Sequence, residues 1–165
     1  DALPTLQTRE RLALAMIVGP FMPAAERRDL QSRAKGLPVQ LRITVSDPLS
    51  YIDAADLVIA RAGYNTTMEI LRSSTPALLI PRPGPSAEQL MRARLFADRG
   101  WVDTLEPDDV NNGTLIEAIA KGLRRERTVC ARSRPDLGGL SAAVEQLDSL
   151  VSTVRLERQH VPTGG

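Results

Sequence analysis

The sequence predicts an α/β fold in which a parallel sheet is flanked by helices. Apolar runs and amphipathic segments alternate along the chain and are joined by short loops. Two runs, 57–59 and 77–80, carry no polar residue at all, as is typical of strands buried on both faces of a parallel sheet. The 165 residues suffice for one domain with a substantial core, and no internal repeat is present.

The strands follow from the apolar runs and from the residues that end them. The run Leu12–Val18 stops at Gly19-Pro20, and residues 39–45 alternate so that every second side chain is apolar. A last short strand begins at Trp101-Val102. Together the runs predict strands at 12–18, 39–45, 57–59, 77–80 and from 101.

The helices follow from apolar spacing, caps and helix-ending glycines. Pro23 opens the first long helix and Gly36 ends it, while Gly100 ends a later one. Asp47-Pro48 begins a short helix. The expected helices span 23–35, 48–55, 65–74, 86–99, 113–123 and 140–151, with irregular chain at 126–139. We expect one domain over residues 1–154 and a tail over 155–165.

The composition excludes several classes of protein. A net charge of 21 − 20 = +1 gives no general attraction to nucleic acid. The lone Cys130 and lone His160 exclude an internal disulfide, a multi-cysteine zinc site and a histidine-based triad within this chain. No run reaches the ~18 apolar residues of a membrane span. Basic residues gather at 121–134, as a solvated helix end or as a surface for anionic headgroups or an acidic partner.

The segment 55–69 carries the clearest sign of a ligand site. A buried strand runs into Arg61-Ala62-Gly63, where we expect Gly63 to turn the chain with a positive φ. Asn65 and Thr66 then offer N-cap side chains. A helix start presents unpaired N–H groups and the positive end of the helix dipole, which suits a phosphate. Glu69, one turn later, is placed for sugar hydroxyls; alternatively, it forms a capping box with Thr66.

A second loop follows the next predicted strand. Residues 81–85 contain three prolines and a glycine, and so form a stiff loop before the helix at 86. Ligands of open parallel sheets bind outside the carboxyl ends of the strands, so adjacent strands would bring both loops together. Glu88 and Gln89 would then face the same ligand as Glu69. Ser86 and Gln89 also fit a capping box, which is the structural alternative.

These two loops resemble the donor half of glycosyltransferase family 28. The residues that carry the resemblance are ADLVIARAGYNTTME at 55–69 and PALLIPRPGPSAEQ at 76–89. A closer resemblance is to a group of uncharacterised predicted glycosyltransferases, which share the turn Gly19-Pro20-Phe21-Met22-Pro23 and the turn Gly63-Tyr64-Asn65-Thr66. The likeness covers roughly residues 12–125. It implies the GT-B architecture of two Rossmann-like domains, of which this chain would be the C-terminal half. The family includes the bacterial enzyme that adds N-acetylglucosamine to the lipid-linked muramyl-peptide precursor.

The resemblance implies a role for each matching residue. Gly63, Tyr64, Asn65 and Thr66 would face the nucleotide diphosphate, and Glu69 would bind the ribose hydroxyls. Glu88 and Gln89 would hold the sugar, where the cell-wall enzyme has two glutamines. The backbone near Val45 would meet the base. Arg61 would lie near the phosphates or form a structural salt bridge.

Two family features lie outside this sequence. The glycine-rich loop after the first donor-domain strand would precede Asp1, as would the N-terminal acceptor domain that carries the family's proposed general base. We therefore expect a piece of a longer protein with no catalytic residue of its own. In the usual strand order the absent strand lies between those at 12–18 and 57–59. The gap would be closed, or filled by strand exchange in a homodimer, or it would result from trimming of a longer protein.

The resemblance favours an inverting, metal-independent transferase that takes a hexose of the N-acetylglucosamine type from a UDP-sugar, without further cofactor. It implies a cytoplasmic protein that meets a lipid-linked acceptor at the inner face of the membrane. One alternative is a nucleotide-sugar-binding subunit that needs a separate partner chain. Another is a domain like the nucleotide-sugar 2-epimerases, and a third is a Rossmann-like domain without a ligand.

Overall fold

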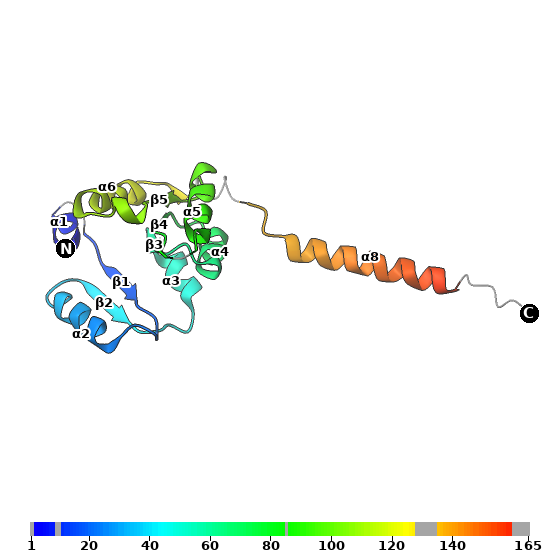
Figure 1. Ribbon diagram of the computed structural model, residues 1–165, viewed down its shortest axis with the longest axis horizontal. Helices are drawn as coiled ribbons and strands as arrows, with labels where there is room; N and C mark the ends of the chain where they lie inside the picture. Colours follow the sequence, from blue (N-terminus) through cyan, green and yellow to red (C-terminus); the bar gives the residue numbers. More distant parts are fainter. Residues whose placement is uncertain (1, 9–10, 85, 128–134, 160–165) are drawn as a thin grey trace, which may run out of the picture. The chain divides into compact units, whose positions relative to one another are not determined.

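The computed structural model describes residues 2–8, 11–84, 86–127 and 135–159 (Figure 1). The chain divides into two compact units, residues 1–134 and 135–165, which are described separately. In the second unit the structure does not describe side chains beyond Ser152.

A small parallel sheet contains the first two strands. β1 (Leu14–Ile17) pairs with β2 (Val39–Arg42), with Leu14 opposite Val39. The crossover between them is α2 (Ala24–Arg33), which has Pro23 as its N-cap. Gly19 and Gly36 adopt φ values of 81° and 76° at the two ends of this crossover, a conformation that favours glycine.

A second parallel sheet contains the other three described strands in the order β3-β4-β5. β3 (Val58–Ala60) pairs with the central β4 (Ala77–Leu79), and β4 pairs with β5 (Asp103–Thr104). The crossover helices are α4 (Tyr64–Arg72) and α5 (Glu88–Asp98). The carboxyl ends of β3 and β4 are therefore neighbours at one edge, as expected, and each leads into a loop and a helix start.

The core lies around β4, whose three residues are all buried. Its apolar cluster joins this strand to α4, α5 and α3 (Pro48–Ala54). The buried members are Ile52, Ala62, Ile70, Leu71, Ala77, Leu79, Ala93 and Val102. Phe96 and Trp101 pack on the cluster with their ring centroids 5.1 Å apart.

The remaining helices of the first unit pack around this sheet. α1 (Ala2–Gln7) lies beside α6 (Asn112–Leu123) in Figure 1, and α6 also contacts β4. The 3₁₀ helix η1 (Pro107–Asp109) precedes α6. Asn111 and Thr114 form a capping box at the start of α6, which the sequence analysis did not identify.

Two expectations about the sheet are corrected. The described strands form two parallel sheets, not one, because β1 and β3 are not hydrogen-bonded to each other. Among the described strands, β3 is consequently at the edge of its sheet, and Ile59 is 43% exposed although we expected this run to be buried on both faces. The expectation holds for β4 alone. That another strand lies between β1 and β3 stays a prediction.

The second unit contains α8 (Gly139–Gln159). Among its described side chains the large apolar residues are at least half exposed: Leu140, Val144, Leu147, Leu150 and Val151. The helix continues to Gln159, although a tail was expected from residue 155; the domain boundary at 154 stays a prediction. No helix in the described part of the chain is both long and apolar enough to cross a membrane.

Candidate functional site

The loop after β3 leads directly into α4, and Gly63 is the N-cap. Its φ of −66° and ψ of 146° are extended, so the positive φ expected for Gly63 is wrong. The expected caps Asn65 and Thr66 are also wrong, because both residues lie inside the first turn. A Cβ placed on Gly63 would meet no atom within 4 Å. The fold alone therefore gives no steric reason for a glycine here.

The start of α4 has no side-chain cap, because Gly63 has no side chain to provide one. The carbonyl of Gly63 accepts two bonds from Thr67, one from its N–H at 3.0 Å and one from its hydroxyl at 2.6 Å. Thr67 is fully buried, which fixes this carbonyl on the inner side of the turn. Tyr64, Asn65 and Thr66 are exposed. Their N–H groups precede the first helical bond and carry the positive end of the helix dipole.

The remaining residues expected near α4 have distinct positions. Glu69 lies half-buried in the second turn, and its expected capping box with Thr66 is excluded because Thr66 is itself helical. Arg61 is exposed and forms no ion pair with the described residues, so the expected structural salt bridge is not seen there. Val45 lies half-buried in the loop after β2, and no described hydrogen bond joins it to α4.

The loop after β4 is attached to the start of α5 by side chains. Gln89 accepts a bond at its Oε1 from the Arg82 N–H, at 3.1 Å. Ser86 accepts a bond at its Oγ from the Glu88 N–H, at 3.3 Å. The N-cap of α5 is Ala87, and the expected capping box of Ser86 with Gln89 is wrong because Gln89 bonds to Arg82 instead.

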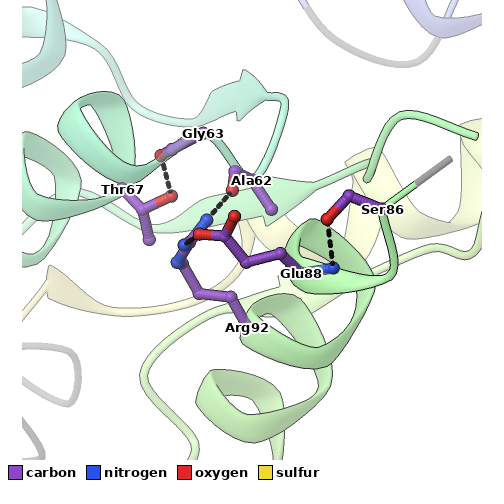
Figure 2. Close-up of polar contacts among 6 residues, drawn as sticks. All are labelled: Ala62, Gly63, Thr67, Ser86, Glu88 and Arg92. Atoms are coloured by element: carbon purple, nitrogen blue, oxygen red, sulfur yellow. Dashed lines mark hydrogen bonds and ion pairs between the residues drawn. The ribbon is translucent and has the colours of Figure 1, made fainter. Parts of the chain in front are cut away.

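Arg92 joins the two loops and was missed by the sequence analysis (Figure 2). Its Nη1 donates to the carbonyl of Ala62 at 2.6 Å, and its Nη2 pairs with the Glu88 carboxylate. Its guanidinium carbon lies 5.7 Å from the centre of the Tyr64 ring, within cation–π range. The Glu88–Arg92 spacing of four residues was the only signal in the sequence; the contacts with Ala62 and Tyr64 are non-local.

The structure therefore brings most of the predicted residues together at one edge of the β3-β4-β5 sheet. The start of α4 and the start of α5 meet there through Arg92. Within the described residues, no group of three His, Cys, Asp or Glu side chains could hold a metal ion. Cys130 and His160 lie outside the described residues. The exposed helix start can offer N–H groups to an anion, and Glu69, Glu88 and Gln89 can offer acceptors to hydroxyls.

Curated relatives are similar to this chain over part of their length. A transferase from Anaeromyxobacter sp. (strain Fw109-5) is 32% identical over 164 residues, which is 94% of this chain and 41% of the relative. Another, from Natranaerobius thermophilus, is 30% identical over 70% of this chain and 32% of the relative. Both are named UDP-N-acetylglucosamine–N-acetylmuramyl-(pentapeptide) pyrophosphoryl-undecaprenol N-acetylglucosamine transferase. The chain thus spans about a third to two fifths of these relatives.

Solved structures confirm the fold. MurG from Acinetobacter baumannii aligns with a TM-score of 0.62 at 19% identity, over 88% of this chain and 44% of that one. The calicheamicin glycosyltransferase CalG4 aligns with a TM-score of 0.68 at 17% identity, over 92% of this chain and 37% of that one. The chain matches one half of these GT-B structures. Residues 1–147 match the family described as "Glycosyltransferase family 28 C-terminal domain". The chain therefore belongs to glycosyltransferase family 28 and corresponds to the C-terminal domain of that family.

Proposed function

We propose that this chain is the donor-binding domain of an inverting, metal-independent glycosyltransferase. It takes a hexose of the N-acetylglucosamine type from a UDP-sugar. The observation that carries the proposal is the uncapped start of α4 beside the start of α5, at the carboxyl edge of a parallel sheet. The names of the curated relatives support UDP-N-acetylglucosamine as the donor.

In this proposal the diphosphate lies against the start of α4. The N–H groups of Tyr64, Asn65 and Thr66 bind its oxygens, and the absence of a Cβ at Gly63 lets them approach the backbone. Arg61 adds an exposed cation beside this turn. When the sugar leaves, negative charge develops on the diphosphate, and oriented donors stabilise it there without a metal ion.

The other parts of the donor bind around this anion site. Glu69 accepts hydrogen bonds from the ribose hydroxyls, one helical turn beyond the phosphates. Glu88 and Gln89, at the start of α5, bind the sugar. The backbone near Val45 contacts the base. All of these roles come from family resemblance; Glu88 is exposed, and Glu69 and Gln89 are half-buried.

The acceptor and the catalytic base come from an acceptor domain outside this chain. The acceptor hydroxyl attacks the anomeric carbon opposite the diphosphate, gives its proton to that base, and the bond to the diphosphate breaks with inversion. That the chain spans 32% and 41% of two relatives supports a further domain. A lipid-linked acceptor would bring the protein to the inner face of the membrane from the cytoplasm.

A second candidate is a donor-binding subunit completed by a separate partner chain. Phe21, in the loop between β1 and α2, is 96% exposed, and Ile17 and Ile43 are each more than 40% exposed. Ile17 ends β1 and Ile43 follows the end of β2, and another domain or chain would cover these apolar side chains. Size-exclusion chromatography of the natural complex distinguishes the two, since a separate subunit co-purifies as a second polypeptide.

Calorimetric titration with UDP and with UDP-N-acetylglucosamine tests the donor site. The titration uses both this chain and the whole natural protein that contains it. We expect saturable binding of both ligands, weakened about tenfold by Glu69→Ala, because a hydrogen bond to a charged group is lost. Glu117→Ala, an exposed glutamate on α6, is the matched control and leaves binding unchanged. A folded whole protein that binds neither ligand contradicts the proposal.

A further inference from the structure

The Arg92 side chain is largely buried and its guanidinium makes three contacts. Its side chain is 13% exposed, although α5 carries it at the edge of the candidate site. Three groups surround the guanidinium. The Ala62 carbonyl and the Glu88 carboxylate are drawn in Figure 2. The third is the Tyr64 ring. Two of these belong to the β3–α4 segment, 30 and 28 residues earlier in the chain. The arrangement therefore fixes the position of the guanidinium relative to the start of α4.

Glu88, by contrast, depends on Arg92 for its position. Its side chain is 69% exposed, and its carboxylate pairs with no other described residue. A long, exposed glutamate samples several rotamers unless a partner selects one. The ion pair selects the rotamer that points along α5 toward Arg92, one turn later, and the rest of the carboxylate keeps acceptor capacity.

The ion pair also determines the charge that a donor sugar meets. An unpaired carboxylate at the donor site would repel the diphosphate, since like charges repel each other. With the guanidinium in contact, the pair carries no net charge while still offering a hydrogen-bond acceptor. The Ala62 carbonyl and the Tyr64 ring keep the Arg92 guanidinium in place when the Glu88 carboxylate accepts a hydrogen bond from a sugar hydroxyl.

We propose that Arg92 is a positioning residue for sugar recognition: it holds the Glu88 carboxylate where it accepts a hydrogen bond from a sugar hydroxyl of the donor. This role rests on the proposed function. It adds that the preference for UDP-N-acetylglucosamine over UDP depends on Arg92, which acts through Glu88. The sequence shows a carboxylate at 88, and the structure shows that it pairs with Arg92.

The test compares UDP with UDP-N-acetylglucosamine, and the measured quantity is the ratio of their dissociation constants. Calorimetry on the whole natural protein uses wild type, Arg92→Met, Glu88→Gln and the double variant. Arg94→Met is the matched control, because Arg94 lies on the same helix and pairs with Glu106 at 2.7 Å, away from both loops. Thermal unfolding of each variant records whether the fold is intact.

We expect Arg92→Met to lower the preference for the sugar nucleotide about tenfold, the scale of one lost charged hydrogen bond, while UDP affinity changes less than about twofold. Since Arg92 acts through Glu88, the double variant loses no more preference than either single variant. Arg94→Met leaves the ratio unchanged.

Three results overturn the inference alone, and a fourth overturns it together with the proposed function. If Arg92→Met weakens UDP and the sugar nucleotide equally, Arg92 has only a structural role in the fold. If the losses of the two single variants add in the double variant, Arg92 does not act through Glu88. If wild type binds UDP but no variant changes the ratio of the two dissociation constants, the inference fails, while the proposed donor site remains supported. Absence of UDP binding in wild type refutes the proposed function itself, together with the inference.

Discussion

The substitution Gly63→Ala distinguishes an effect on the stability of the fold from an effect on ligand binding. The residue has an ordinary φ of −66°, and a Cβ there meets nothing within 4 Å, so alanine fits the unliganded protein. Alanine lowers the conformational entropy of the unfolded chain, and this stabilises the folded state by about 0.4–1 kcal/mol. It is also a poorer N-cap than glycine, which costs a similar amount. We therefore expect the free energy of unfolding to change by less than about 1 kcal/mol.

The added methyl group lies where the proposal puts the diphosphate. We expect UDP affinity to fall at least about tenfold, or ~1.4 kcal/mol, with the fold unchanged. Urea unfolding gives the stability and calorimetry gives the affinity. Gly139→Ala in α8 is the control, because a Cβ at Gly139 also meets no atom within 4 Å. We expect it to change the free energy of unfolding by less than about 1 kcal/mol and to leave UDP affinity unchanged. Unchanged UDP affinity in Gly63→Ala would refute the close approach of the diphosphate to this turn.

Three further predictions concern the helix start, the core and acid stability. Tyr64→Pro should bind UDP more weakly than Tyr64→Ala, because both lose the ring but only proline lacks the N–H; Gly63 is extended, with a ψ of 146°, and accepts a following proline. Equal affinities in calorimetry would exclude that N–H as a ligand. Leu79→Ala, at a fully buried position of β4, should lower the free energy of unfolding by about 2–5 kcal/mol in urea titrations, and a loss under about 1 kcal/mol would contradict the core described above. Bonds from the Ser50 hydroxyl and N–H lower the pKa of Asp47, and Arg94 lowers the pKa of Glu106. Both carboxylates therefore stabilise the fold above their unfolded pKa values and lose this effect as the pH falls through their folded ones. The Asp47→Asn/Glu106→Gln protein should show a shallower loss of stability from about pH 5 to pH 2, and an unchanged pH profile would contradict these shifts.

Local pattern was sufficient to predict most of the elements. Apolar runs located β1 to β4 to within a few residues, since buried strands of a parallel sheet carry little polar character. Asp47 was correctly placed at the start of α3, where it accepts from the Ser50 N–H. The order of strands and helices likewise placed the loops after β3 and β4 side by side.

The errors concern features that neighbours in space decide. Asn65 and Thr66 have good capping side chains, yet Gly63 is the N-cap of α4 because the chain is extended up to Gly63 and turns into the helix two residues before Asn65. Arg92 escaped notice because the Ala62 carbonyl becomes its partner only after α5 packs beside the β3 loop. Whether β3 is a central or an edge strand depends on pairing, which the run 57–59 does not encode.

The central claim is that backbone N–H groups at the start of α4 bind the diphosphate of a sugar nucleotide. Amide chemical shifts measured by NMR during a UDP titration test it most directly, because each N–H reports its own environment. We predict the largest shifts at Tyr64, Asn65 and Thr66, extending to Glu88 and Gln89 when UDP-N-acetylglucosamine replaces UDP. Shifts confined to another region, such as the α2 surface, or none at saturating UDP, would contradict the account.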